Sequence, residues 1–276
     1  MGKDSVGDCP VELDLTLVQS LVAEQFPVWS RRVVRRVEPG GWDNRTFRLG
    51  DDLLVRLPSH ARYVAQVPKE QRWLPFLGPL LPVPIPVPVA LGRPALGYPW
   101  PWSVYGWLEG EPASALVDTP ALAEDLAIFL RALQAIEPHG GPPPGEHNFS
   151  RGGALLTYDQ DTRQALSDLA GNVDAVACER VWEGALATTA TAPAAWLHGD
   201  VAGTNLMVRD GRLAAVLDFG GMAVGDVACN AGARTCGRAC GSGMSRDASS
   251  GAFARKVGVD GCAASRGVAT LGNGAG

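Results

Sequence analysis

The chain has 276 residues and a formal charge of −5, and 46% of its residues are hydrophobic while 19% are charged. This composition is ordinary for a globular protein and argues against disorder of the whole chain. The net negative charge disfavours nucleic-acid binding through a general basic field. The length favours two lobes, because single hydrophobic cores stop growing near roughly 250 to 300 residues.

The N-terminal segment lacks the apolar run of a signal peptide, and no stretch approaches the roughly 20 apolar residues of a membrane span. We therefore expect a cytoplasmic protein with a small-molecule partner, no nucleic acid and no membrane. The six cysteines show no paired spacing typical of a zinc site, so free thiols are expected.

The first part of the chain predicts an amphipathic helix over residues 13–26, because its apolar residues recur at helical spacing. Strand formers then alternate with turn residues, which predicts an antiparallel hairpin followed by a short helix. The strand-forming stretches are 33–37 and 46–57. A turn at 50–52 interrupts the second stretch before residues 53–57, and the helix is expected over 69–77.

A proline-rich connector follows. Eight prolines lie between residues 79 and 101, which excludes a helix there and confines any strand to a sheet edge. An aromatic strand is expected next, with a lobe boundary close to Gly110 and a mainly helical second lobe. The strand is expected over 102–108, a helix over 120–136, a loop over 138–153 and two helices over 155–189.

The residues after Trp196 carry the chemistry. Two short apolar runs, 206–208 and 213–217, are separated by a turn that contains Asp-Gly, a strong hairpin signal. A hairpin brings its ends together, so Asp200 and Asn205 before the first strand should lie close to Asp218 after the second. Two carboxylates and an amide oxygen suit Mg²⁺, which takes a few carboxylates together with phosphate oxygens. Such a site is typical of phosphoryl transfer.

Two motifs in this segment carry a resemblance. His198-Gly199-Asp200, followed after four residues by Asn205, resembles the H-x-D-x-x-x-x-N catalytic loop of kinases, and Asp218-Phe219-Gly220 resembles their D-F-G metal motif. The His-Gly-Asp form is similar to the aminoglycoside phosphotransferase family. The resemblance implies an α+β, two-lobed protein-kinase-like fold, with a small antiparallel sheet lobe over 1–110 and a mainly helical lobe over 111–230.

The same resemblance implies roles for individual residues. Asp200 would be the catalytic base, Asn205 and Asp218 the magnesium ligands, and His198 a structural support for the loop. Asp226 resembles a position that steadies the catalytic loop. The implied cofactors are Mg²⁺ and ATP or another nucleoside triphosphate.

Residues upstream resemble the family's nucleotide site. Gly40, Gly41 and Asn44 are similar to the nucleotide-covering loop, in which small residues let backbone amides approach phosphates. Arg56 stands where kinases place a lysine, with Glu70 as its candidate partner. Arginine can hold a phosphate but is not equivalent to lysine, and an ordinary surface ion pair is the alternative interpretation.

The run 103–110 resembles the hinge between lobes, so Tyr105 and Trp107 are candidates for the wall of the adenine pocket. The alternative for this run is the core of a strand. Residues 145–153 resemble a loop of bacterial relatives, and the sequence indicates no chemistry for it.

The resemblance ends at about residue 230. Residues 231–276 hold eleven glycines and ten alanines, no Trp, Tyr or Ile, and a local charge of +4 from six basic and two acidic residues. We expect this tail to be irregular, because glycine opposes helix by about 1 kcal/mol per site. The change in composition suggests translation in a shifted reading frame of a high-GC gene, and a natural flexible tail is the alternative.

The sequence therefore predicts an Mg²⁺-dependent enzyme that moves the γ-phosphoryl group of a nucleoside triphosphate to a hydroxyl of a small molecule, aminoglycoside-like or other. The alternative is an inactive nucleotide-binding remnant whose C-terminal acceptor pocket is disrupted. A protein kinase is disfavoured by the His-Gly-Asp form and by the lack of an A-P-E segment after Gly220.

Overall fold

The computed structural model describes residues 9–38, 43–113, 120–188 and 192–230. The chain divides into two compact units, one of Met1–Asp125 with Leu206–Gly220 and the other of Leu126–Asn205 with Gly221–Gly276. The polypeptide therefore returns to the first unit for residues 206–220 before it completes the second. Gly40, Gly41 and the predicted tail over 231–276 lie outside the described residues.

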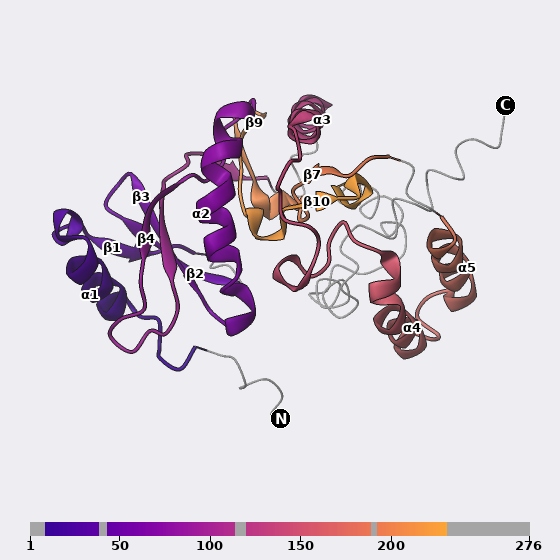
Figure 1. Ribbon diagram of the computed structural model, residues 1–276, viewed down its shortest axis with the longest axis horizontal. Helices are drawn as coiled ribbons and strands as arrows, with labels where there is room; N and C mark the ends of the chain where they lie inside the picture. Colours follow the sequence, from indigo (N-terminus) through magenta and orange to yellow (C-terminus); the bar gives the residue numbers. More distant parts are fainter. Residues whose placement is uncertain (1–8, 39–42, 114–119, 189–191, 231–276) are drawn as a thin grey trace. The chain divides into compact units, whose positions relative to one another are not determined.

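An antiparallel sheet of five strands forms the centre of the first unit (Figure 1), as predicted from the strand and turn pattern. Its strand order is β1-β2-β3-β5-β4, so the proline-containing strand β4 lies at an edge, where a missing backbone N–H costs no ladder bond. The strands are β1 (Val34–Arg36), β2 (Asn44–Leu49), β3 (Leu53–Pro58), β4 (Pro88–Gly92) and β5 (Trp102–Gly106).

Helix α1 (Leu15–Gln25) covers one face of this sheet and confirms the predicted amphipathic helix. Asp14 caps it, because its Oδ1 accepts a hydrogen bond from the N–H of Leu17 at 2.7 Å. The buried face of the helix packs with Val55 and Leu57 of β3 in one apolar cluster. Side chains alternate along a strand. Arg56 lies between Val55 and Leu57, so its side chain points to the sheet face opposite α1.

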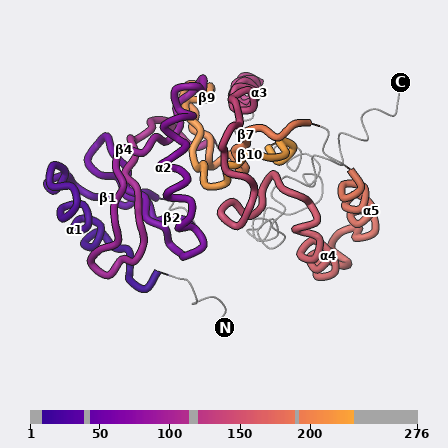
Figure 2. The backbone as a smooth tube through the Cα atoms, in the orientation of Figure 1, coloured from indigo at the N-terminus to yellow at the C-terminus, as the bar shows by residue number. Residues whose placement is uncertain are grey.

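Helix α2 (Gln66–Leu77) begins three residues earlier than predicted and contains Pro75. It contacts β4 and β5 and runs alongside the sheet in the backbone trace of Figure 2. A single 3-10 turn over Gly78–Leu80 follows it, which corrects the prediction that the proline run contains no helix. Pro79 is tolerated there because the first positions of a helix need no N–H donor.

The predicted hairpin after residue 205 is confirmed by β8 (Leu206–Arg209) and β9 (Arg212–Val216), in which Leu206 pairs with Val216. Asp210 and Gly211 both have positive φ, as a tight two-residue turn requires. The short strand β6 (Glu111–Pro112) adds to β8 and was not predicted, since two residues give no periodicity.

The second unit contains helices α4 (Asp159–Asp168) and α5 (Ala175–Leu186) and most of α3 (Pro120–Ala135), all three within predicted ranges. A 3-10 turn over Leu155–Tyr158 precedes α4. A hydrogen bond connects helices α4 and α5: the indole N–H of Trp182 in α5 donates to Oδ1 of Asp159 in α4 at 2.7 Å.

Strands β7 (Ala195–Leu197) and β10 (Ala223–Gly225) pair antiparallel in the second unit, a pairing that the sequence did not predict. Each strand has three residues, too few to show alternation. Because β7 ends directly before His198, this pair fixes the start of the predicted catalytic loop.

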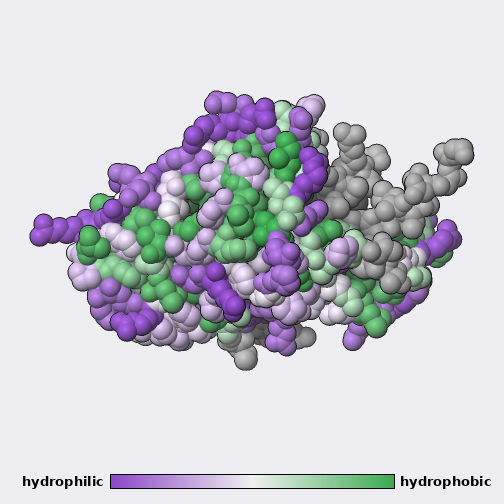
Figure 3. All heavy atoms as spheres, turned by 45° about the horizontal axis from the view of Figure 1, so that its top comes forward, coloured by the Kyte–Doolittle hydropathy of each residue, from purple (hydrophilic) through white to green (hydrophobic). Residues whose placement is uncertain are grey.

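Hydrophobic side chains are interrupted by hydrophilic ones over the face drawn in Figure 3. Across the described ranges, no helix combines the length and the apolar character that crossing a membrane needs. Three of the six cysteines, Cys9, Cys178 and Cys229, lie in these ranges and are free thiols, as predicted.

Candidate active site

The predicted catalytic loop is held by its own backbone and by a buried histidine. His198 is fully buried, and its Nδ1 accepts a hydrogen bond from the N–H of Asp200 at 3.1 Å. Gly199 between them has a φ of +83°, and a Cβ at this position would lie 2.3 Å from the carbonyl oxygen of Gly221. Only glycine fits this turn, because it needs both the positive φ and the close approach.

Asn205 is bonded to Asp200 within the same unit. Its Nδ2 donates to the backbone oxygen of Asp200 at 3.0 Å and to Oδ2 of that carboxylate at 3.2 Å. The Asp200 side chain remains one-third exposed. The loop therefore presents one partly exposed carboxylate with an amide beside it, which is the residue pair that the kinase-like motif predicts.

Asn230 was not predicted as a site residue, yet it supports the catalytic loop. It is buried, and its Oδ1 accepts hydrogen bonds from the N–H groups of His198 at 3.1 Å and Gly199 at 3.3 Å. Asp226 lies nearby in sequence and caps the following turn through a bond from the N–H of Ala228 to its Oδ1 at 3.0 Å. An asparagine alone in a sequence gives no signal of such a contact.

A second cluster lies in the first unit around Arg56. Its Nη1 lies 3.2 Å and 3.3 Å from the two carboxylate oxygens of Glu70, and its Nη2 lies 2.8 Å from Oδ1 of Asp218. The Arg56 side chain is 14% exposed and that of Asp218 is 31% exposed. Burial alone would lower the pKa of Arg56, but the two carboxylates hold it above its usual value. The guanidinium is therefore charged and joins β3, α2 and the metal motif.

Tyr105 also belongs to this cluster. It is buried in β5, and its hydroxyl donates to Oε2 of Glu70. Burial, followed by the Glu70 carboxylate, raises the pKa of Tyr105 well above its ordinary value, so the hydroxyl keeps its proton. Tyr105 thus lies in the strand core, and its contact with a nucleotide stays a prediction.

Two further residues of α2 that were not predicted contact the metal motif. The ammonium of Lys69, which is buried, donates to the carbonyl oxygen of Gly220 at 2.7 Å. The Gln66 amide lies against Gly220, where a Cβ would come within 2.8 Å of it. The glycine of the metal motif is therefore required by the packing of α2.

Asp43, at the exit of the predicted covering loop, belongs to the same neighbourhood. Burial, and then the charge of Asp218, raises the pKa of its carboxyl group, while the charge of Arg56 and hydrogen bonds from Tyr63 and Gln66 oppose the shift. Its backbone oxygen accepts bonds from the N–H of Ser59 at 3.0 Å and from the Ser59 hydroxyl at 3.0 Å. This end of the loop is thus tied to the residue after β3.

The remaining predicted residues are placed separately. Asn44 is buried at the start of β2, opposite Pro58. Trp107 is half-buried, and the guanidinium of Arg48 lies 4.2 Å from its ring centroid. Asp200 and Asn205 belong to one unit and Asp218 to the other. The approach of Asp218 to the first two residues stays a prediction.

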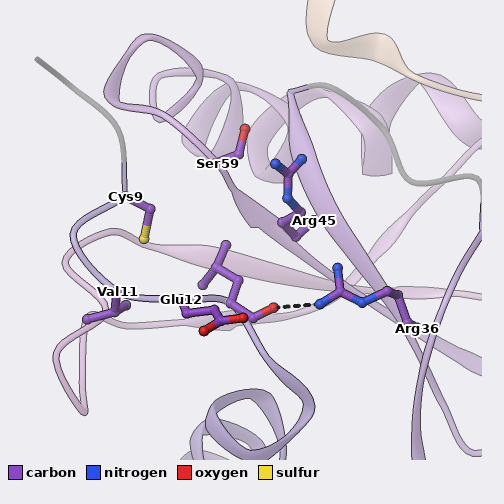
Figure 4. A pocket seen from close by; sticks show the side chains of 7 residues that line it. Cys9, Val11, Glu12, Arg36, Arg45 and Ser59 are labelled. Carbon is purple, nitrogen blue, oxygen red and sulfur yellow. Dashed lines mark hydrogen bonds between the residues drawn. The ribbon is translucent and has the colours of Figure 1, made fainter. Parts of the chain in front are cut away.

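A hollow of about 480 Å³ lies elsewhere in the first unit (Figure 4). The dashed line from Arg36 in Figure 4 marks the hydrogen bond that its Nη2 donates to the carbonyl oxygen of Leu13 at 3.1 Å. The hollow shares no residue with the predicted site. Its lining consists of Cys9, Val11, Glu12, Leu13, Arg36, Arg45 and Ser59.

Comparison with known proteins decides the family. A model of the phosphotransferase enzyme family matches residues 34–236, a range that contains both motifs and the Arg56 cluster. The chain belongs to this family. No curated protein matches the sequence. The family match ends forty residues before the last residue of the chain, inside the glycine-rich segment.

Solved structures of similar proteins show the fold of this chain. The aminoglycoside phosphotransferase APH(2″)-IIIa with GDP and kanamycin has a TM-score of 0.62 at 20% identity, over 94% of this chain and 86% of that one. The streptomycin–ATP complex of APH(2″)-IIa scores 0.54 at 22% identity, over 80% and 75%. Macrolide 2′-phosphotransferase MphH from Brachybacterium faecium scores 0.55 at 21% identity, over 96% and 94%. The predicted α+β kinase-like fold is confirmed.

Each of the two residues predicted as magnesium ligands carries an oxygen of the kind that magnesium binds. Asp218 offers a partly exposed carboxylate, and Asn205 turns its Nδ2 to Asp200, so its Oδ1 is the atom left for a cation. Within the ranges that the structure describes, no three His, Cys, Asp or Glu side chains gather as a metal cage. Magnesium suits such a sparse oxygen set, because it usually takes one or two carboxylates together with substrate phosphates.

Proposed function

We propose that this phosphotransferase moves the γ-phosphoryl group of ATP or another nucleoside triphosphate to a hydroxyl of a small molecule, with Mg²⁺. The observation that carries the proposal is the bonding of Asn205 to Asp200 beside a buried His198. This bonding supports the proposal because it places a proton acceptor and a possible metal ligand on the same loop, and phosphoryl transfer needs both.

Asp200 is the proposed base. The acceptor hydroxyl attacks the γ-phosphorus, its O–P bond forms as the bond to the leaving diphosphate oxygen breaks, and its proton passes to the Asp200 carboxylate. The hydrogen bond from Nδ2 of Asn205 to Oδ2 of Asp200 orients that carboxylate. A positioned base of this kind contributes about 10²- to 10⁴-fold to a rate.

Asn205 and Asp218 are the proposed magnesium ligands. The ion supplies neutralisation of the phosphate charge and a fixed orientation for the transferred group. Arg56 is the proposed phosphate contact from the sheet, and Glu70 holds it by both carboxylate oxygens. Gly40, Gly41 and Asn44 are proposed to cover the phosphates, and Tyr105 and Trp107 to adjoin the base.

The acceptor is a hydroxylated small molecule. The solved neighbours include a complex with GDP and kanamycin, a complex with ATP and streptomycin, and the apoenzyme of a macrolide 2′-phosphotransferase. Membership of the phosphotransferase family and a fold shared with these proteins support a small hydroxylated acceptor for this chain. A cytoplasmic location is part of the proposal, since that compartment holds the nucleoside triphosphates.

A second candidate is an inactive nucleotide-binding remnant. It is favoured by the composition of residues 231–276, where the family match stops at residue 236. The region after the metal motif would then lack the helices that form an acceptor pocket, while the Arg56 and Asp200 clusters would remain.

One experiment separates the two candidates. Purified protein is titrated with Mg·ATP and Mg·GTP, and turnover is measured with kanamycin, streptomycin and a macrolide. Metal-dependent nucleotide binding with transfer supports the enzyme, and binding without transfer to any of these acceptors supports the remnant. Nucleotide affinity that is absent, or that is equal with and without Mg²⁺, would contradict both.

A further inference from the structure

The loop over 145–153 places a largely buried cation, Arg151, beside the proposed base. The Nη1 atom of Arg151 lies 3.9 Å from Oδ2 of Asp200, and the Arg151 side chain is only 14% exposed. This loop is the one motif that the proposed function leaves without a role. Both residues lie in the second unit.

Asn148 fixes the backbone around Arg151. It is fully buried, accepts a bond from the N–H of Gly145 at 2.9 Å and donates to the Arg151 carbonyl at 2.9 Å. Its Nδ2 also lies 3.2 Å from the carbonyl oxygen of Gly221, directly after the metal motif. One buried amide thus ties the arginine loop to the chain that follows Asp218-Phe219-Gly220.

The residues before Arg151 have an unusual backbone conformation. Phe149 and Ser150 have φ values of 58° and 59°, which non-glycine residues adopt rarely and mostly where the surroundings impose it. The Tyr158 hydroxyl donates to the Phe149 carbonyl at 2.5 Å, and the Phe149 ring centroid lies 5.5 Å from the Arg151 guanidinium. The fold therefore enforces this conformation and directs the arginine.

Two glycines let the loop approach the catalytic segment. A Cβ on Gly152 would lie 2.3 Å from Cδ2 of Leu197 in β7, and the Gly152 carbonyl accepts the N–H of Asp226 at 2.8 Å. A Cβ on Gly221 would lie 3.1 Å from Nη1 of Arg151. The guanidinium of Arg151 therefore lies close to the backbone at Gly221, where any larger residue would crowd it.

The charge pair with Asp200 does not explain this arrangement. A separation of 3.9 Å is too long for a hydrogen bond, whereas a bidentate arginine–carboxylate pair has contacts near 2.8 Å. A planar guanidinium with several donors suits phosphate oxygens, and this one lies next to the carboxylate proposed as the base.

We propose that Arg151 is a catalytic residue of phosphoryl transfer, whose guanidinium contacts the transferred phosphoryl group next to Asp200. This inference rests on the proposed function. In the step, the acceptor oxygen bonds to the γ-phosphorus, the diphosphate leaves with the electron pair of the broken bond, and Asp200 receives the proton. Arg151 keeps its protons throughout and balances the negative charge of the phosphoryl oxygens.

The test compares a nucleoside diphosphate with a transition-state mimic. Calorimetry measures binding of Mg·ADP and Mg·GDP, each with and without aluminium fluoride, to wild type, Arg151→Ala, Arg151→Lys and Arg180→Ala. Arg180 is an exposed arginine on α5 and serves as the matched control. We expect Arg151→Ala to bind the fluoroaluminate complex about 10- to 1000-fold more weakly while diphosphate affinity changes less than about threefold.

A second background separates contact with the phosphoryl group from orientation of Asp200. If Arg151 acts directly, Arg151→Ala weakens fluoroaluminate binding as much in an Asp200→Asn protein as in wild type. If it acts only through the Asp200 carboxylate, the effect disappears in that background, which would overturn the inference. Arg151→Lys should recover part of the affinity, because it keeps the charge without the planar fork.

The outcomes remain distinguishable. Wild type that binds no Mg·nucleotide would contradict the proposed function and this inference together. Wild type that binds normally, with unchanged fluoroaluminate affinity in the folded Arg151 variants, would overturn the inference alone. If Arg151→Ala does not melt cooperatively, Arg151→Lys and Arg151→Gln decide in its place, since both preserve the bulk of the side chain.

Discussion

Arg56 donates through Nη2 to Oδ1 of Asp218 at 2.8 Å, although 162 positions separate the two residues. The same guanidinium contacts both carboxylate oxygens of Glu70. Asp218 is also the carboxylate that we propose as a magnesium ligand. A divalent cation must therefore share or displace the guanidinium, and the residue at position 56 should set the affinity of the metal.

Arg56→Lys should increase the affinity for a divalent cation. Lysine lacks the two separate nitrogens with which Arg56 reaches Glu70 and Asp218 at once, and Glu70 is the more buried partner, with 4% of its side chain exposed. Lysine should stay with Glu70 and release Asp218. We expect Mn²⁺ to bind at least roughly threefold more tightly, because it no longer competes with one partly exposed ion pair. A titration followed by electron paramagnetic resonance measures the change. Arg35→Lys, an exposed position on β1, is the control, and unchanged or weaker Mn²⁺ binding would contradict the competition.

Asp218→Asn should remove the metal dependence of nucleotide binding. Charge on the triphosphate cannot be held near other carboxylates without a cation, and asparagine keeps the shape while it removes one charged ligand. Affinity for Mg·ATP and Mg·GTP should fall at least about tenfold, because one charge-assisted contact is lost. Calorimetry against Asp210→Asn, an exposed turn position in the same hairpin, provides the comparison. Equal affinity in all three proteins argues against the ligand assignment.

Asp200→Asn should abolish transfer while nucleotide affinity changes little. The base acts mainly in the transition state, so its loss lowers kcat by about 10²- to 10⁴-fold. The hydrogen-bonded position beside Asn205 and His198 can accept an amide. A steady-state assay with the best acceptor measures the loss, and wild-type turnover in this variant removes Asp200 from the mechanism.

Lys69→Met should loosen the metal motif more than the protein as a whole. The bond from Nζ to the Gly220 carbonyl joins α2 to that motif, but burying an ammonium is costly, so an apolar stem can preserve overall stability. We expect faster amide exchange over residues 216–220, weaker Mn²⁺ binding and a nearly constant melting temperature. Arg72→Met, an exposed cation on the same helix, should change none of these. Equal exchange in the two variants would show that Lys69 does not position the loop.

Elements with strong local signals were predictable. The hairpin around Asp210 and Gly211 follows from turn chemistry between apolar runs, and α1 follows from helical spacing with Asp14 as its cap. The site motifs could be recognised for a similar reason, since Asp200, Asn205 and Asp218 lie at kinase-like spacings on either side of that hairpin, and their roles stay a prediction.

Long-range contacts were not predictable, because nothing near them in sequence depends on them. The bond from Lys69 to Gly220 spans 151 positions, and that from His198 to Asn230 spans 32. β7 and β10 pair over three residues each, without any periodic pattern. Arg151 was not predictable for the same reason. Its proposed role depends on the approach of its loop to Asp200, and no spacing within the loop indicates that approach.

The C-terminal segment gives the last prediction. Its composition, with eleven glycines and ten alanines over 231–276, offers few large apolar side chains to offset the entropy of ordering it. Leu156 and Val176 in the second unit are 70% and 67% exposed, and Val181 on α5 is 48% exposed. A family-like helical continuation could cover such residues.

We therefore expect a chain with the reading frame restored near codon 230 to be more stable and more active than this one. Burial of even a few hundred Å² of apolar surface, at about 25 cal/mol per Å², gives on the order of 5 to 10 kcal/mol, comparable with the stability of an ordinary domain. Thermal melting and turnover with the acceptor panel are compared for this chain, the frame-restored chain and a chain that ends at Asn230. If this chain melts at the same temperature as the restored one and transfers phosphate as fast, then residues 231–276 are a native part of the enzyme and the shifted-frame hypothesis fails. If it behaves like the chain that ends at Asn230, the segment adds nothing to folding or catalysis.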